Sequence, residues 1–342
     1  MAVYLHLWFI STVYFGFTEL SMDWSKGEVF LTLLYFMTAV GIVQMLIKSY
    51  ISTYLHEHYM KLIAWMKSQY TEVKVQGLMR EIVERNLHAA FKQSRMIILM
   101  YIGVFGMAPL GYMATVILRQ GLHAVIIIPF ISYDHPSAKL IYYSVEFPYT
   151  LLAGILSGVG DSTTIIAGIH IMKAVDTIND LIRLLDDKDK ANQCPNILIV
   201  IYKKHSEIIK MLSTLNEIMY LISLIQLFTS TFMFLVLFTS ARTQPMEMVF
   251  YLFQLCVISQ LFLLCAFGEV IFSKTQVIFT QLYLTKWYDM SLSNQKAILM
   301  MMRMSEAPYG LKAGGMFDIN MYTFIQIVKM AISYCAIIIT LA

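Results

Sequence analysis

The last apolar segment of the chain carries polar side chains at a spacing that suggests a function. Between residues 322 and 340 they recur at steps of three, four or seven residues, as Tyr322, Gln326, Lys329, Ser333 and Thr340. At about 100° per residue, these steps place them on one side of a helix, where Ile337 fills the remaining gap. Such a stripe predicts either a polar seam against another helix or the lining of a pore. We favour the pore, because an ionisable residue within an apolar span usually marks an ion or substrate path; alternatively, Lys329 extends to the membrane interface.

A second pattern suggests proteolysis within a membrane. Residues 158–161 read Gly-Val-Gly-Asp, which matches the Gly-x-Gly-Asp motif of intramembrane aspartyl proteases. Those enzymes need two membrane carboxylates that share one proton. Asp134 and Asp289 lie in segments between the predicted spans. The match is therefore interpreted as chance, and Asp161 is expected to be a polar anchor that points toward the interior of the helix bundle.

Other histidines and carboxylates give no stronger sign of chemistry. His56 and His58 flank Glu57, but side chains two residues apart point about 200° around a helix, so a solvated face is expected rather than a metal site. His170 is expected to be a polar anchor and Glu269 an interface residue. The sequence contains no nucleophile elbow, phosphate loop or haem motif. It therefore predicts no enzyme, no cofactor and no metal site.

These residues belong to a strongly apolar chain. Of its 342 residues, 58% are hydrophobic and 14% are charged, and the mean hydropathy is +0.65, whereas soluble domains have about 25% charged residues. Seven segments reach the length of about 17 to 25 residues that a membrane helix needs. They are residues 3–20, 29–47, 96–118, 147–170, 218–241, 248–268 and 319–342. We predict an all-α, seven-transmembrane bundle, because a spanning backbone must satisfy its own hydrogen bonds. The net charge of +3 gives no reason to expect nucleic acid.

The basic residues predict how the chain threads the membrane, because short cytoplasmic loops are rich in Lys and Arg. The connections after the second, fourth and sixth spans carry eight, seven and five of the 25 basic residues, and those after the first, third and fifth carry one, two and one. We therefore predict a cytoplasmic N-terminus and an extracellular C-terminus. A G-protein-coupled receptor threads the opposite way.

Two of the long connections are predicted to be helical. Residues 50–95 and 173–217 carry apolar side chains at helical spacing between charged ones, with single interruptions at Gly77 and Pro195. We expect the membrane helices to continue below the bilayer and to pack on one another there. The chain then divides into one membrane domain with cytoplasmic extensions, residues 1–272, and an anchor segment with the last helix, residues 273–342.

A ligand pocket is harder to place, because apolar residues in a membrane bundle are mostly packing. A small organic ligand needs a concave, mainly apolar and aromatic site, and flexible methionines suit loosely specified shapes. The outer halves of the second, third, fourth and sixth spans offer ten candidates. They are Phe30, Tyr35, Phe36, Met107, Met113, Phe147, Tyr149, Phe250, Tyr251 and Gln254.

A series of motifs in fixed order fills the end of the chain. They are Tyr283-x-x-x-Trp287, residues 302–308 (Met-Arg-Met-Ser-Glu-Ala-Pro), residues 311–317 (Leu-Lys-Ala-Gly-Gly-Met-Phe), Thr323-Phe324, Lys329 and Ser333-Tyr334. Isolated matches upstream are Asp161, His170, His205, Gln254, Cys265 and Gly268. In this order and spacing, the chain resembles the insect odorant receptors over nearly its whole length.

The resemblance implies a ligand-gated, non-selective cation channel in the plasma membrane of sensory neuron dendrites. In that family, an odorant-tuning subunit assembles with a shared odorant receptor co-receptor (Orco), and the channel is a tetramer. The cytoplasmic extensions are implied to form an anchor between subunits, and the last helix is implied to surround the pore. Alignment from the C-terminus places Ile337 at the hydrophobic gate and Thr340 at the outer constriction. The implied ligand is a volatile organic compound.

Two alternatives have the same general composition. A gustatory receptor of the same superfamily shares the topology, but the Ala-Gly-Gly-x-Phe stretch at residues 313–317 favours the odorant branch. A secondary transporter normally has related halves and helices that are broken at mid-membrane. The sequence shows no such repeat, although Pro109 and the glycines of the fourth span leave some room for breaks.

Overall fold

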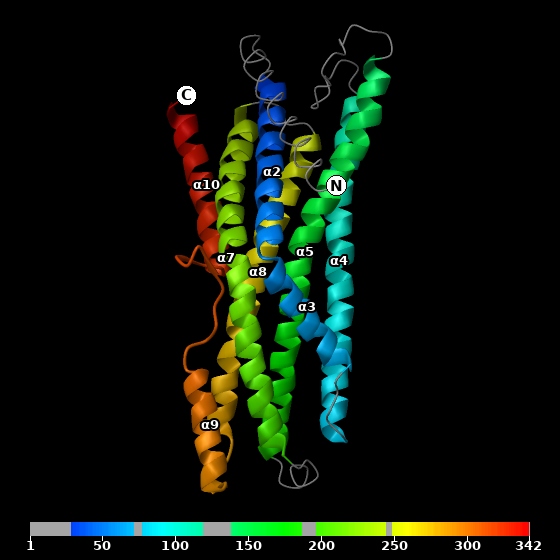
Figure 1. Ribbon diagram of the computed structural model, residues 1–342. Helices are drawn as coiled ribbons and strands as arrows, with labels where there is room; N and C mark the ends of the chain where they lie inside the picture. Colours follow the sequence, from blue (N-terminus) through cyan, green and yellow to red (C-terminus); the bar gives the residue numbers. More distant parts are fainter. Residues whose placement is uncertain (1–28, 72–76, 119–137, 187–195, 244–247, 342) are drawn as a thin grey trace.

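The computed structural model describes residues 29–71, 77–118, 138–186, 196–243 and 248–341, which form a long bundle of helices (Figure 1). The helices are α2 (Val29–Tyr54), α3 (His56–Thr71), α4 (Leu78–Leu118), α5 (Ala138–Asp186), α7 (Ile197–Thr243), α8 (Met248–Leu284), α9 (Leu292–Met304) and α10 (Met321–Leu341). A 3-10 turn, η1 (Trp287–Asp289), lies between α8 and α9, and two short strands, β1 (Lys312–Ala313) and β2 (Phe317–Asp318), precede α10. The described part is almost entirely helical, as the apolar pattern predicts.

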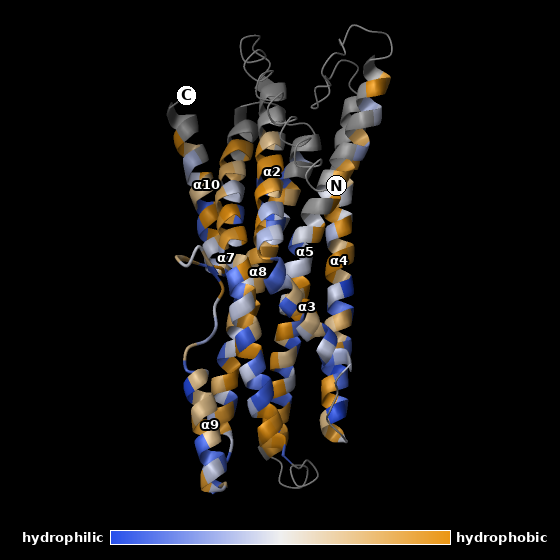
Figure 2. Ribbon diagram, viewed as in Figure 1, coloured by the Kyte–Doolittle hydropathy of each residue, from blue (hydrophilic) through white to orange (hydrophobic). Residues whose placement is uncertain are grey.

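Six of the predicted spans coincide with these helices. Residues 29–47 lie in α2, 96–118 in α4, 147–170 in α5, 218–241 in α7, 248–268 in α8 and 319–342 largely in α10. The predicted span at residues 3–20 lies outside the described residues. By length and composition alone, the described stretches 197–237 and 254–284 qualify as membrane-crossing helices. Hydropathy changes along the bundle in Figure 2, where the upper parts of α2, α7 and α10 are mostly apolar and the lower parts alternate.

The predicted helical connections are confirmed. α4, α5, α7 and α8 each continue well beyond their apolar stretch, and α3 crosses against α5 and α7 (Figure 1). Their inward faces form an apolar core that includes Ile178, Leu181, Leu212 and Leu215. Because α5 is one unbroken helix through its glycines, it lacks the mid-membrane break that a transporter interpretation needs.

Ion pairs join the polar halves of these helices. Asp176 on α5 accepts hydrogen bonds from Lys173, at 3.0 Å, and from Lys274 on α8. Asp180, one turn further along α5, is paired with Arg85 of α4 at 2.8 Å and also accepts from Asn86. These contacts help to fix the register of α5 against α4 and α8, because each carboxylate of α5 is paired with a particular residue of a neighbouring helix.

Candidate functional site

The polar stripe of α10 lies on the side of the helix that faces away from the rest of the chain. α10 packs on α7 and α8 at the edge of the bundle (Figure 1). Of its described side chains, Ile327 and Ala331 are buried, whereas Gln326, Lys329 and Ser333 are exposed. At about 100° per residue, the buried pair is opposite the stripe. The described stripe residues are therefore not a seam against another helix of the same chain.

Of the last two positions on this face, Ile337 and Thr340, the structure describes the side chain of Ile337 alone. Ile337 is 53% exposed. Thr340 belongs to α10, but its side chain is outside the described part of the structure.

The start of α10 is held by groups on two segments. The side-chain oxygen of Asn320 accepts a hydrogen bond from the Thr323 backbone N–H, at 2.8 Å, which is a helix N-cap. Glu269 on α8 accepts from the Met321 N–H at 3.3 Å, where a carboxylate also complements the helix dipole. Glu269 is thus an interface residue, as expected, and its partner is the backbone of α10.

A glycine lets the two segments approach each other next to this cap. A Cβ added at Gly268 would lie 2.0 Å from the backbone oxygen of Ile319. Real Cβ atoms do not come so close to a carbonyl oxygen, so any side chain here must displace the chain that leads into α10. Gly268 is one of the residues on which the resemblance was based.

Gly268→Ala is therefore expected to destabilise the protein by about 1–3 kcal/mol, the usual cost of overpacking a tight site. The thermal midpoint of the purified receptor, followed by fluorescence-detected size exclusion, measures this loss. Gly103→Ala is the matched control, because a Cβ at this helical glycine meets nothing within 4 Å. A midpoint for Gly268→Ala equal to that of the control would contradict the close approach.

The Gly-Gly pair of the C-terminal motif forms a tight turn. Gly314 and Gly315 have φ values of +59° and +71°, and the strands on either side pair Ala313 with Phe317. Two consecutive positive φ angles characterise the type I′ hairpin turn, which glycine adopts most easily. The Gly314 N–H donates to the backbone oxygen of Tyr220, at 2.9 Å, so the turn docks on α7.

A buried histidine joins α7 to the other half of the motif. His205 is 2% exposed, and its Nε2 lies 2.8 Å from the Ser305 hydroxyl, just after α9. Burial lowers the pKa of His205 to about 4, so the imidazole is neutral at physiological pH. The two matching positions, 100 residues apart, are thus one structural contact.

Charged and amide side chains form a network within the bundle. Lys48 of α2 and Asp161 of α5 are paired at 2.7 Å, with side chains 13% and 14% exposed. Lys48 also donates to the Gln226 side-chain oxygen, as does Gln44. The Gln226 amide nitrogen donates to Gln260 on α8, at 3.1 Å. Four helices therefore meet at one polar centre.

This network confirms one expectation and gives Lys48 a partner that the sequence did not reveal. Lys48 lies in α2, which continues to Tyr54, and its side chain turns into the bundle. Asp161 is an interior anchor, as expected, and its carboxylate is committed to Lys48. A cavity of about 30 Å³ adjoins the pair, which is room for about one water molecule.

The structure describes the side chains of four of the ten candidate ligand residues. Met107 and Tyr251 are exposed, while Phe147 and Gln254 are half-buried. The side chains of Phe30, Tyr35, Phe36, Met113, Tyr149 and Phe250 lie outside the described part of the structure. A ligand pocket in the outer half therefore stays a prediction.

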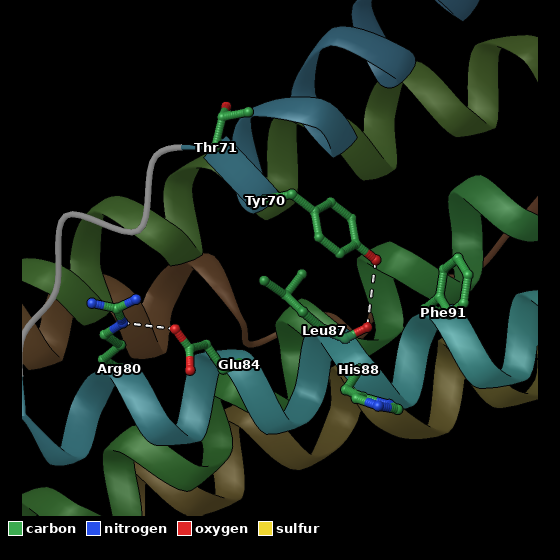
Figure 3. A pocket seen from close by; sticks show the side chains of 7 residues that line it. All are labelled: Tyr70, Thr71, Arg80, Glu84, Leu87, His88 and Phe91. Atoms are coloured by element: carbon green, nitrogen blue, oxygen red, sulfur yellow. Dashed lines mark hydrogen bonds and ion pairs between the residues drawn. The ribbon is translucent and has the colours of Figure 1, made fainter.

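A cavity of about 450 Å³ lies instead at the other end of the bundle, between α3 and α4. Figure 3 shows Tyr70 reaching from α3 toward α4, which contributes Phe91 at one end of the cavity and the Arg80–Glu84 ion pair, at 2.6 Å, at the other. The Tyr70 hydroxyl lies 3.0 Å from Nε2 of His170, which makes His170 the polar anchor that was expected. The charged residues in this lining do not suit an apolar volatile ligand.

His56, Glu57 and His58 are not assembled into a metal site. His58 is paired with Glu217 of α7 at 2.8 Å, whereas His56 and Glu57 are exposed. Within the described residues, no three His, Cys, Asp or Glu side chains are grouped so as to hold a metal ion.

Comparison with known proteins assigns the family. Residues 27–332 match the family described as 7tm Odorant receptor. Among solved structures, the insect olfactory receptor OR5 from Machilis hrabei superposes with a TM-score of 0.77 at 13% identity, covering 99% of this chain and 88% of that one. The same receptor in complex with eugenol gives 0.70 at 13% identity, covering 97% and 88%. No curated protein sequence matches significantly. The fold is thus the seven-transmembrane fold of an olfactory receptor, and the chain, a membrane receptor and not an enzyme, belongs to the 7tm odorant receptor family.

Proposed function

We propose that this receptor is the odorant-tuning subunit of a ligand-gated, non-selective cation channel. It assembles with the co-receptor Orco as a tetramer in the plasma membrane of sensory neuron dendrites. The observation that carries the proposal is the face of α10 formed by Gln326, Lys329, Ser333 and Ile337, which is turned away from its own subunit. A polar stripe in a membrane helix needs water or protein on that side, and a central pore supplies water.

The ligand is proposed to be a volatile organic compound that binds in the outer half of the bundle. The eugenol complex of the similar receptor shows that this fold accommodates a small organic molecule. α8 carries three of the candidate residues, Phe250, Tyr251 and Gln254, and continues to Glu269, which caps α10. A ligand that binds the open arrangement more tightly shifts the gating equilibrium by its differential affinity, and α8 connects its site to the pore helix.

Co-expression with Orco in oocytes, screened with volatiles that include eugenol, tests the proposal. We expect inward cation currents that require both subunits and depend on ligand concentration. Patch recordings separate a channel from a transporter, because unitary current steps belong to channels alone. Ligand-dependent uptake without such steps would favour the transporter.

Lys329→Gln is expected to raise unitary cation conductance by at least about twofold, because a fixed positive charge beside a pore lowers the local cation concentration. Single-channel recording in symmetrical sodium measures the change. Lys61→Gln, which removes an equally exposed charge on α3, is the control and should leave conductance unchanged. Identical conductance in the two variants would remove Lys329 from the pore.

The proposed threading places the N-terminus in the cytoplasm and the C-terminus outside, because basic residues gather in the second, fourth and sixth connections. An epitope added after Ala342 is therefore expected to be labelled on intact cells. An epitope within residues 187–195 should be labelled only after permeabilisation. The reverse result for the two sites would contradict this threading.

A further inference from the structure

We propose that a groove between α2 and α7 binds the choline headgroup of a phospholipid. The groove has a volume of about 460 Å³. Tyrosines and aliphatic side chains at the end of α2 form one wall, and polar and apolar side chains of α7 form the other. The lining residues are Tyr50, Ile51, Tyr54, Leu55, Asn216, Glu217, Tyr220 and Leu221.

The groove lies at the membrane boundary. The predicted spans 29–47 and 218–241 both end beside it, since one stops just before Tyr50 and the other starts within the α7 face. α2 and α7 run antiparallel, and contacts bracket the groove at Gln44–Gln226 on one side and His58–Glu217 on the other. Figure 2 shows the change from apolar to mixed character at this level of the bundle. A lipid headgroup occupies this depth.

The polarity of the lining follows that of a lipid. Antiparallel packing puts the α2 and α7 residues Tyr50, Ile51, Tyr220 and Leu221 toward the membrane end, and Tyr54, Leu55, Asn216 and Glu217 toward the polar end. An amphiphile in the groove would keep its acyl chain against the first group and its head against the second. Because the groove lies at the membrane boundary and has an amide and a carboxylate only at its polar end, the occupant we propose is a lipid.

The lining of the groove as a whole suits a cation. Tyr50 and Tyr54 are 70% and 80% exposed, although both line the groove, and Tyr220 is 43% exposed. The only charged side chain in the lining is the Glu217 carboxylate, which is also paired with His58 at 2.8 Å and is 56% exposed. Several aromatic rings with one carboxylate form the type of cage that recognises quaternary ammonium groups. An anionic lipid head would find no basic side chain in this lining.

Tyr220 is held in place from behind. Its backbone oxygen accepts the Gly314 N–H at 2.9 Å, and a Cβ at Gly315 would lie 3.2 Å from its ring. The hairpin before α10 therefore supports one wall of the groove. A lipid seated there contacts the same α7 segment that receives the hairpin.

Native mass spectrometry of the purified receptor complex tests the proposal. The complex is released from nanodiscs that contain equal amounts of phosphatidylcholine and phosphatidylglycerol with identical acyl chains. We expect phosphatidylcholine to be retained in about tenfold preference, the effect of two or three cation–π contacts. The double variant Tyr50→Leu with Tyr54→Leu should lose this preference, and Tyr288→Leu, which removes an exposed tyrosine on η1, should keep it.

Glu217→Gln provides a second test that leaves the aromatic wall intact, and it should reduce the preference. Size-exclusion profiles identical to wild type show that each variant is folded. Equal retention of the two lipids by the wild-type complex would overturn the proposal, and so would an unchanged preference in both groove variants. Absence of any retained lipid would overturn it as well.

Discussion

Replacement of Ile337 by serine is expected to raise the basal current of the co-expressed channel on the order of tenfold, equivalent to about 1.4 kcal/mol of bias toward the open state. Ile337 lies on the exposed face of α10, next to the polar stripe. An apolar ring at a constriction keeps it free of water and closed, and a hydroxyl permits wetting. The measurement is the ligand-independent current, normalised to surface expression.

The chain offers a matched control on the same helix. Ile332 is also 53% exposed, but at about 100° per residue it points roughly 140° away from Ile337. Ile332→Ser should leave the basal current unchanged. If Ile337→Ser alters neither basal nor ligand-evoked current, Ile337 is not the gate.

Asp161→Leu is expected to cost about 3–5 kcal/mol, because it leaves the Lys48 ammonium buried without its counter-charge. The yield of monodisperse receptor and its thermal midpoint should both fall sharply. Adding Lys48→Met to Asp161→Leu should restore most of the loss, since the double variant contains no unpaired charge. A buried ion pair can often be replaced by apolar side chains with little net change.

An exposed pair serves as the reference. Arg80 and Glu84 are paired at 2.6 Å with side chains 60% and 52% exposed. Such surface pairs contribute at most about 1 kcal/mol, so Glu84→Gln should shift the midpoint little. Equal losses for Asp161→Leu and Glu84→Gln, or no recovery in the double variant, would contradict the buried network.

The sequence predicted the helices well because their signal is local. Apolar runs and helical spacing placed five spans within helices of the structure and a sixth largely within α10, and the helical extensions beyond the spans were confirmed. Lys48 shows the limit of this reasoning. A basic residue at the end of an apolar run usually lies at the interface, and nothing local reveals a partner 113 residues away.

Contacts between distant segments account for the other residues that sequence reasoning missed. Gly268 was noted only as a motif residue, whereas its role follows from the Ile319 backbone that passes over it. Glu269 was expected at an interface, but its function as a cap for α10 depends on where α10 begins. A signal that could have found this cap is an acidic residue at the end of one predicted span, at the same depth as the predicted start of another.

The candidate site was predictable to different degrees. The stripe on α10 follows from periodicity alone, and the structure shows which side of the helix its own subunit covers. The ligand residues have no comparable periodic signal, because packing and binding select the same apolar side chains. The pore role of Lys329 and Thr340 and the gate role of Ile337 remain proposals.

Cysteine accessibility along α10 tests the central claim most directly. Single cysteines at Gln326 and Ser333, on the stripe, are compared with cysteines at Ile327 and Ala331, on the buried side, in a Cys335→Ala background. A charged, membrane-impermeant thiol reagent is applied during ligand-evoked current. We predict rapid modification that blocks or alters the current at the two stripe positions and no effect at the two buried ones. Equal reactivity on both sides, or none on the stripe, would contradict the proposal that α10 lines an aqueous pore.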